Sequence, residues 1–239
     1  MMLFCDVVIA IARHYRETIN ELYGIPSCKI ELITNSLDIP WEMMNEGRKE
    51  SLRTRYGFRK DEKLIIFAGR LDSVKGIHEL IEAFKMLQET RPDAGLIIAG
   101  DGNLKKCFES VGPYWSKVTF TGFVSKKRLY DLYAVTDLGV VPSLHEEFGY
   151  VALEMIRSGL TVLVNYTKGL KELADCFSHV LTVDFGTYVF GDRVRMLKDK
   201  IEEYMNDRCS TRPMNHGVHK DEYAFHSFSR QMKLLYQRL

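Results

Sequence analysis

Short apolar runs alternate with amphipathic segments along most of the chain from residue 62 onward. Each run is rich in Val, Ile, Leu or Ala and is bounded by polar or glycine positions, which is typical of a strand buried on both faces. We expect strands at residues 64–68, 96–99, 118–121, 138–141, 162–164 and 180–183. Between the runs, apolar residues recur at helical spacing. We expect helices at residues 77–87, 102–111, 125–134, 149–158, 168–175, 192–206 and 221–237.

This alternation of buried strands and amphipathic helices predicts the fold class. Strands that are apolar throughout need cover on both faces, and helices between successive strands supply it. We therefore expect an α/β domain built on a parallel sheet with helices on both faces. Ligands of such sheets bind beyond the carboxyl ends of the strands, so a site is expected in the loops that follow the strands.

The first 40 residues have a different pattern. We expect a strand at about 7–11, a helix at about 14–23 and a strand at 29–33. Residues 41–61 are polar and charged, which predicts a helix and a linker. So small a strand-and-helix unit cannot bury itself. It must pack on the main domain or on a structure outside this chain.

The apolar start of the chain invites comparison with a signal peptide. It has no basic segment, Asp6 interrupts it, and Arg13-His14 ends it. It is also too short to span a bilayer. A buried strand is the better prediction.

Composition excludes some classes of function. The chain has 33 basic and 32 acidic residues and a net charge of +1, so it lacks the basic field that binds a nucleic-acid backbone. Its five cysteines are an odd number, widely scattered and without a C-x-x-C pair. That argues against a disulfide framework or a zinc site and for a reducing compartment. We expect a cytoplasmic protein with no nucleic-acid partner.

Two cations lie in the loop after the first strand of the main domain. Arg70 stands at the carboxyl edge and Lys75 at the start of the next helix, so both can converge on one anion. A diphosphate leaving group gains negative charge as a glycosidic bond breaks, and fixed cations stabilise that transition state more than the ground state. The alternative is an exposed loop with two solvated cations. The loop alone does not decide between them.

Glu146 and Glu154 bracket a Phe148-Gly149 pair directly after the fourth of these strands. A carboxylate in this loop can accept from sugar hydroxyls, and backbone N–H groups at the helix start can face phosphate. A second carboxylate, just over one turn into the helix, can accept from ribose hydroxyls. Gly149 has no Cβ and lets the backbone approach a ligand closely. Either glutamate could be a plain surface residue, but the Phe-Gly insert favours a nucleotide-sugar site.

Two further turns have more than one interpretation. Gly100-Asp101-Gly102 looks like a phosphate loop, but a tight turn with Asp101 capping the next helix explains it better. Residues 165–172 either present amides or Glu172 to a ligand or form a simple connection. The sequence contains no P-loop and no Ser/His/Asp or Cys/His nucleophile arrangement.

Together these segments resemble the nucleotide-sugar half of the retaining GT-B glycosyltransferases, the group 1 or family 4-like enzymes. The matching segments run in the family's order and cover roughly residues 62–185. They are Gly69-Arg70-Leu71 with Lys75-Gly76, Gly100-Asp101-Gly102, Phe120-Thr121-Gly122-Phe123-Val124, Pro142-Ser143, Glu146-x7-Glu154 with Phe148-Gly149, and Gly169-x-x-Glu172. The resemblance implies a Rossmann-like C-terminal domain of a GT-B fold. Residues 5–10 resemble the last strand of the acceptor-side domain, residues 35–38 the crossing between domains, and residues 228–239 the helix that returns.

The resemblance also implies roles for individual residues. Arg70 and Lys75 would hold the diphosphate, Glu154 the ribose and Glu146 the donor sugar. Arg70, Lys75 and Glu146 are thus the catalytic candidates. Other donor contacts would come from the backbone of Phe148, Gly149 and Tyr150 at the phosphate and sugar, and of Gly122, Phe123 and Val124 at the base. Such enzymes retain the anomeric configuration, with a donor phosphate oxygen helping to take the acceptor's proton. They need no cofactor or bound metal, because Arg and Lys replace the metal.

The resemblance divides the chain into successive parts. Residues 1–40 would be a short remnant of the acceptor-side domain with the crossing, 41–61 a linker, 62–220 the donor-binding domain and 221–239 the return helix. Two complete domains need about 300–400 residues, so most of the acceptor domain is expected to be absent from this chain. Glu147 and Lys168 stand where the family usually has glycine, and Thr161 where it has proline.

We therefore expect the donor-binding half of a retaining hexosyltransferase that uses a UDP- or GDP-sugar. Its acceptor would be a saccharide or lipid-linked molecule of a bacterial polysaccharide or cell-envelope pathway, met in the cytoplasm or at the inner face of the membrane. The alternative is a non-catalytic nucleotide-sugar-binding module that docks with a partner chain. A related epimerase or a phosphorylase is less favoured, since no motif suggests the pyridoxal-bearing lysine of a phosphorylase.

Overall fold

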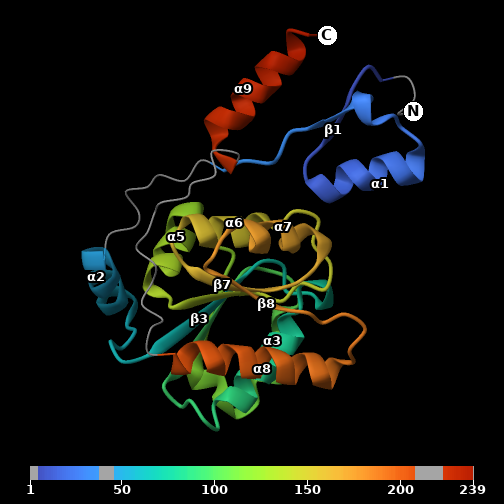
Figure 1. Cartoon of the computed structure of the whole chain (residues 1–239). Coiled ribbons are helices and arrows are strands. Elements are labelled where there is room, and N and C mark those ends of the chain that lie inside the picture. Colours follow the sequence, from blue (N-terminus) through green and yellow to red (C-terminus); the bar gives the residue numbers. More distant parts are fainter. Residues whose placement is uncertain (1–4, 38–45, 208–222, 239) are drawn as a thin grey trace.

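The computed structural model describes residues 5–37, 46–207 and 223–238, and a parallel sheet lies at its centre (Figure 1). All six strands predicted for the main domain are present. They are β3 (Lys63–Ala68), β4 (Ala94–Ala99), β5 (Val118–Gly122), β6 (Leu138–Val141), β7 (Thr161–Asn165) and β8 (Val180–Val183). They pair in the order β5-β4-β3-β6-β7-β8. The chain therefore places β4 and β5 on one side of β3 and then returns to place β6, β7 and β8 on the other, so the switch point of the sheet lies between β3 and β6.

Helices cover both faces of this sheet, as the apolar strands require (Figure 1). One face carries α3 (Ile77–Leu87), α4 (Leu104–Val111) and α8 (Phe190–Asn206). The other carries α5 (Lys126–Val135), α6 (Tyr150–Arg157) and α7 (Lys168–Cys176). Each layer has its own apolar core against the sheet. The predicted α/β fold with helices on both faces is confirmed. Short 3₁₀ turns that the sequence did not predict are η2 (Ser27–Lys29), η4 (Ser73–Lys75) and η5 (Gly112–Lys117).

The start of α4 corrects one prediction. The helix begins at Leu104 rather than 102, and its cap is Asn103, whose side chain accepts from the N–H of Lys106. The carboxylate of Asp101 instead accepts from the N–H of Gly102 at 2.7 Å. The cause is a contact distant in sequence: Leu71 donates to the carbonyl of Asp101 and accepts from the N–H of Asn103. This pairing holds residues 101–103 against the β3 loop, so the helix starts later.

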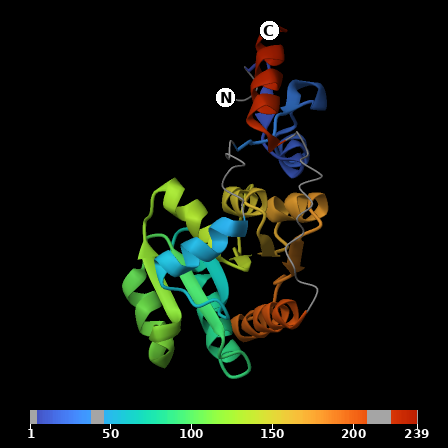
Figure 2. The same ribbon diagram turned by 90° about the vertical axis from the view of Figure 1, so that its left-hand side faces the viewer.

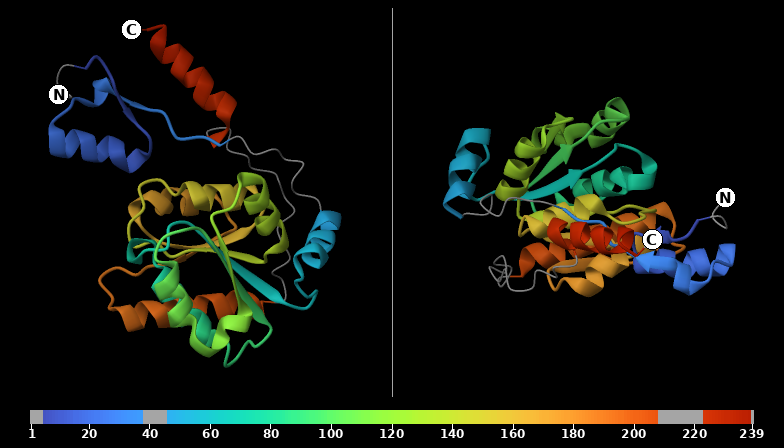
Figure 3. Two further views of the ribbon diagram at one scale, coloured as in Figure 1. Left: turned by 180° about the vertical axis from the view of Figure 1, so that it is seen from behind. Right: turned by 90° about the horizontal axis from the view of Figure 1, so that it is seen from above.

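The N-terminal segment forms a small unit of its own. It consists of the parallel pair β1 (Val8–Ala10) and β2 (Ile30–Leu32), with α1 (Arg13–Tyr23) between them. The predicted strand-helix-strand order is confirmed. In Figures 2 and 3 this unit and α9 (Phe225–Tyr236) lie beside each other, on the α6–α7 side of the sheet domain. Leu37 donates to the carbonyl of Tyr223 at 3.1 Å, and buried Tyr223 joins the core under α6 and α7. The unit itself packs on the main domain, because Arg13 at the start of α1 pairs with Glu172 of α7 at 3.3 Å and Ala12 joins the same core.

The predicted helix between the two parts is α2 (Glu46–Tyr56), and Arg53 fixes it to the sheet. The Arg53 side chain is 7% exposed and forms an ion pair with Asp137 at 2.7 Å. Its other hydrogen bonds go to the carbonyl oxygens of Val135, Arg59, Lys60 and Glu62. Asp137 also accepts from Lys49 and from the N–H of Leu64 in β3. This cluster ties α2 and the following loop to the start of the sheet.

No helix within the described ranges has the length and apolar character that crossing a bilayer requires. Among the described residues, Cys5, Cys28, Cys107 and Cys176 are not disulfide-bonded, while Cys209 lies outside the described residues. Residues 38–45 and 208–222, where the sequence suggested a crossing, a linker and the end of the main domain, also lie outside them. The division of the chain at residues 40, 61 and 220 therefore stays a prediction.

Candidate functional site

The loops after β3, β6 and β7 meet at the carboxyl edge of the sheet, where the sequence predicted a site. The N–H of Leu144 donates to the carbonyl of Val74 at 2.8 Å and joins the first two loops. Asn165 joins the second and third, because its amide nitrogen donates to the carbonyl of Ser143 at 2.9 Å. Asn165 is 4% exposed and its amide oxygen accepts from the N–H of Phe185. A network of backbone and amide bonds thus fixes the loops.

Lys75 and Glu146 are brought together at this edge. Nζ of Lys75 lies 2.7 Å from Oε2 of Glu146, and the hydroxyl of Ser143 donates to the same oxygen at 3.3 Å. The two charged side chains are 23% and 18% exposed. The backbone of Lys75 is fixed as well, since its N–H donates to the carboxylate of Asp72 at 3.0 Å. A cation and a carboxylate are therefore held side by side, partly out of water.

Arg70 is placed differently from Lys75. Its side chain is 74% exposed and pairs with Asp72 at 3.3 Å. The interactions described for Arg70 do not bring it to the Lys75–Glu146 pair. Such an exposed ion pair is weak, so the guanidinium remains free to turn toward an anion at the same edge.

The Phe148-Gly149 insert forms the start of α6. Gly149 caps the helix with a φ of 85°, a conformation that side chains other than glycine rarely adopt, and no side chain bonds the first-turn N–H groups as a cap. The N-terminus of a helix with such N–H groups attracts anions. Phe148 is buried, and its ring packs 5.0 Å from that of Tyr150, which is exposed. The insert therefore directs the N-terminus of α6 toward the carboxyl edge of the sheet.

Glu154 lies one turn further along α6 and is 9% exposed. Burial raises the pKa of its carboxyl, and the charge of Lys126 on α5 opposes this. Gly122 ends β5, and its carbonyl accepts from the N–H of Gly100 at 3.0 Å. Phe123 is 87% exposed and Val124 is half-buried. These residues extend the site edge from the centre of the sheet toward β5.

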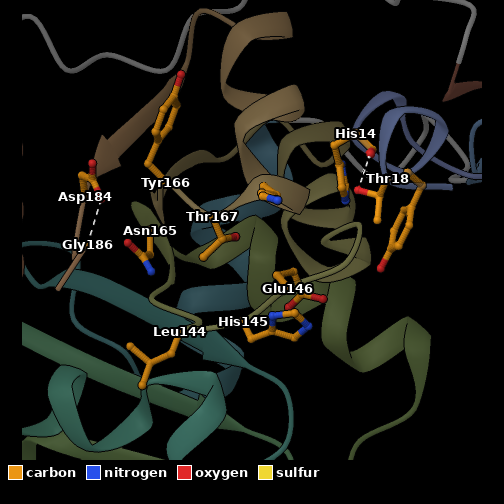
Figure 4. A pocket seen from close by; sticks show the side chains of 12 residues that line it. His14, Thr18, Leu144, His145, Glu146, Asn165, Tyr166, Thr167, Asp184 and Gly186 are labelled. Atoms are coloured by element: carbon orange, nitrogen blue, oxygen red, sulfur yellow. Dashed lines mark hydrogen bonds between the residues drawn. The ribbon is translucent and has the colours of Figure 1, made fainter. Parts of the chain in front are cut away.

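A pocket of about 700 Å³ opens beside Glu146, between the sheet domain and α1 (Figure 4). Of the predicted site residues, Glu146 alone is among those that line this pocket in the described structure. The other walls come from His14, Tyr15 and Thr18 of α1, from Leu144 and His145, from residues 165–168, and from Asp184 and Gly186.

Sequence reasoning missed the part of this pocket that α1 forms. It predicted the helix but gave no indication of which face meets the main domain. It also left open whether Glu172 faces a ligand. In the structure Glu172 accepts from the N–H of Arg13 at 3.0 Å and pairs with its guanidinium. The sequence signal for the role of Asn165 is its position as a polar residue directly after the apolar run 162–164.

Potential metal ligands do not cluster in this part of the molecule. Across residues 5–37, 46–207 and 223–238, no group of three or more His, Cys, Asp or Glu side chains is arranged to hold a metal ion. The predicted donor-binding residues supply two cations, Arg70 and Lys75, two carboxylates, Glu146 and Glu154, and the N-terminus of α6.

Comparison with known proteins points to one family. Residues 48–220 match the family described as "Glycosyl transferases group 1". An uncharacterized glycosyltransferase of Methanocaldococcus jannaschii, MJ1607, is 36% identical over 172 residues, which cover 70% of this chain and 44% of the relative. The mannosylfructose-phosphate synthase of Agrobacterium fabrum is 30% identical over 235 residues, 92% of this chain and 50% of that protein. The chain thus spans about half the length of these relatives.

A solved structure with the same fold is that of Anabaena Alr3699/HepE in complex with UDP and glucose. It superimposes with a TM-score of 0.81 over 99% of this chain and 64% of its own, at 21% sequence identity. The superposition includes the small N-terminal unit as well as the sheet domain.

Proposed function

The chain belongs to the group 1 glycosyltransferases, and on this basis we propose that it binds the nucleotide-diphosphate sugar donor of a sugar-transfer reaction. Its sheet domain has the Rossmann-like fold of the nucleotide-sugar half of GT-B enzymes. The HepE structure with the same fold holds UDP and glucose. The reaction as a whole uses an acceptor that the remainder of such enzymes helps to bind.

The contact between Lys75 and Glu146 carries this proposal. At 2.7 Å each group neutralises the other in the free protein. A donor offers both a different partner: a phosphate oxygen for Lys75 and a sugar hydroxyl for Glu146. Because both side chains are already held at the edge of the sheet, little reorganisation is needed when the donor binds.

The remaining donor contacts follow from the positions of the other predicted residues. Arg70 turns from Asp72 to the diphosphate, and the N–H groups of Gly149 and Tyr150 face a phosphate at the start of α6. Glu154 accepts from the ribose hydroxyls, and the backbone of residues 122–124 contacts the base. Burial of Glu154 supports its role, because a carboxylate partly removed from water makes stronger hydrogen bonds.

We propose that the transfer retains the anomeric configuration. The bond from the anomeric carbon to the diphosphate breaks, and the acceptor oxygen bonds to that carbon on the same face. The acceptor's proton passes to the departing phosphate oxygen. Lys75 and Arg70 stabilise the negative charge that grows on the diphosphate, the task that a metal ion performs in other nucleotide-sugar enzymes.

We propose a hexosyl group on UDP or GDP as the donor and a saccharide or lipid-linked molecule as the acceptor. This chemistry fits an enzyme that builds a bacterial polysaccharide or cell-envelope glycolipid. It would act in the cytoplasm or at the inner face of the membrane. The mannosylfructose-phosphate synthase relative supports a sugar-type acceptor.

Replacing Glu154 by glutamine tests the ribose contact. We expect Glu154→Gln to weaken UDP binding about tenfold, because an amide replaces a charged acceptor of the ribose hydroxyls. The measurement is calorimetric titration with UDP and with its 2′,3′-dideoxy form. The wild type should prefer UDP, and the variant should lose most of that preference.

The matched control is Glu203→Gln on α8, which removes an exposed carboxylate that pairs with Lys200. It should bind both nucleotides as the wild type does. If Glu154→Gln keeps the full preference for UDP, then Glu154 does not contact the ribose.

A further inference from the structure

Two unpaired polar atoms lie on the walls of the pocket beside Glu146. Nδ1 of His14 and Oγ1 of Thr167 are buried, and neither has a hydrogen-bond partner in the described part of the chain. Both residues line the pocket together with Glu146. Figure 4 shows His14 approaching from α1 and Thr167 from the turn before α7. Buried polar atoms are usually paired, so two such atoms in one pocket indicate a ligand.

The position of His14 is fixed by the residues on either side. Arg13 bonds Glu172 on α7 through both its N–H and its guanidinium, at 3.0 and 3.3 Å. Burial raises the pKa of the Tyr15 phenol, and so do the charge and hydrogen bond of Glu147, next to Glu146. The His14 ring packs on the Tyr15 ring with centroids 4.5 Å apart. The imidazole is therefore held at the pocket wall.

The position of Thr167 is fixed by the packing of α7. It is the cap residue of α7, yet its hydroxyl makes no capping bond to the helix, although threonine at this position usually does. The first turn of α7 packs directly on the Glu146 loop, since a Cβ on Gly169 would lie 2.2 Å from the carbonyl oxygen of Glu146. The turn that carries Thr167 therefore packs on the loop that carries Glu146, while the Thr167 hydroxyl itself has no partner there.

The chemistry of these groups indicates a ligand rich in hydroxyls. Burial lowers the pKa of His14, although Glu172 acts in the opposite direction. A neutral imidazole has one donor and one acceptor nitrogen, as a hydroxyl ligand requires. Together with a threonine hydroxyl and a carboxylate, it suits a polyhydroxy compound. The pocket volume of about 700 Å³ exceeds that of a single hexose ring and falls in the usual range of small-molecule sites.

We propose that His14 and Thr167 bind hydroxyls of the transferred sugar and thereby help to select which sugar the site accepts. The inference rests on the proposed function and extends it, because it assigns part of the sugar subsite to α1 of the N-terminal unit. Glu146 holds the sugar from the β6 loop, His14 from α1 and Thr167 from the start of α7.

The test separates binding of the nucleotide from binding of the sugar. Calorimetry gives the Kd of UDP and UDP-glucose, GDP and GDP-mannose, and ADP and ADP-glucose for each variant. His14→Phe keeps the ring on Tyr15 but removes both nitrogens, and Thr167→Val keeps the shape but removes the hydroxyl. For the cognate pair, each variant should lose about 3–10-fold in the affinity of the nucleotide sugar relative to the nucleotide. The affinity for the nucleotide itself should stay within about twofold.

Thr54→Val is the control. It removes a threonine hydroxyl on α2 that bonds only its own helix in the described structure, so the ratio of the two affinities should not change. An unchanged ratio in both His14→Phe and Thr167→Val would overturn the assignment. An equal loss for nucleotide and nucleotide sugar would also overturn it, because the residues would then act by holding the loop. Failure of every nucleotide to bind the wild type would instead refute the proposed function itself.

Discussion

Replacing Lys75 by alanine is expected to weaken nucleotide-diphosphate binding by about 10–100-fold, which corresponds to about 1.4–2.8 kcal/mol. The change removes the cation that lies 2.7 Å from Glu146. It also leaves the Glu146 carboxylate, 18% exposed, without that charge beside an incoming diphosphate. Both effects act against an anionic ligand. The measurement is calorimetric titration of the wild type and Lys75→Ala with the nucleotide that the chain binds.

The double variant separates these two effects. Lys75→Ala with Glu146→Gln should bind the nucleotide more tightly than Lys75→Ala alone, because the repulsive carboxylate is gone. Lys85→Ala on α3 removes a lysine that pairs with Glu82 on the same helix, and it should bind as the wild type does. Wild-type affinity in Lys75→Ala would refute the assignment of Lys75 to the diphosphate.

Replacing Arg53 by methionine is expected to lower the free energy of unfolding by about 3–5 kcal/mol. The guanidinium is 7% exposed and bonds Asp137 together with four backbone carbonyl oxygens. Removing it leaves one buried acceptor, the carbonyl of Val135, and four part-buried ones without their donor, although methionine keeps much of the side-chain volume. Urea unfolding followed by circular dichroism gives the difference. In contrast, Arg59→Met removes an exposed pair with Asp61 and should cost less than about 1 kcal/mol.

The same cluster predicts how stability depends on pH. Burial acts to raise the pKa of Asp137, but Lys49, Arg53 and the N–H of Leu64 prevail and hold that pKa below its ordinary value of 3.8. A carboxyl with a lowered folded-state pKa stabilises the fold fully above its unfolded pKa and loses the contribution as pH falls through the folded pKa. Below pH 3.8 the wild type should therefore lose stability more steeply than Asp137→Asn. Equal slopes for the two proteins would mean that Asp137 does not contribute as an ion.

The fold was predictable because local pattern and tertiary structure agree. The run 64–68 is apolar at every position, and β3 is buried on both faces between β4 and β6. The start of α4 was not predictable in the same way. Leu71 pairs with residues 101 and 103 across some 30 positions of sequence, and no local signal reveals that contact.

The candidate site, too, was predictable from the sequence only in part. The order of the motifs predicted that Lys75 and Glu146 belong to one site, and the structure places them in contact. The direction of Arg70 was not predictable, because Asp72, two positions later, competes for its charge. The position of His14 at the pocket was not predictable, because it depends on the packing of α1 against α7 through Arg13 and Glu172.

Calorimetric titration of this chain with UDP, GDP and ADP in parallel determines whether it binds a nucleotide at all. We expect saturable binding of one nucleotide, with a Kd between roughly 1 μM and 1 mM, that weakens in both Lys75→Ala and Glu154→Gln. No saturable binding of any of the three, by a chain that is folded by circular dichroism, would contradict the proposed function.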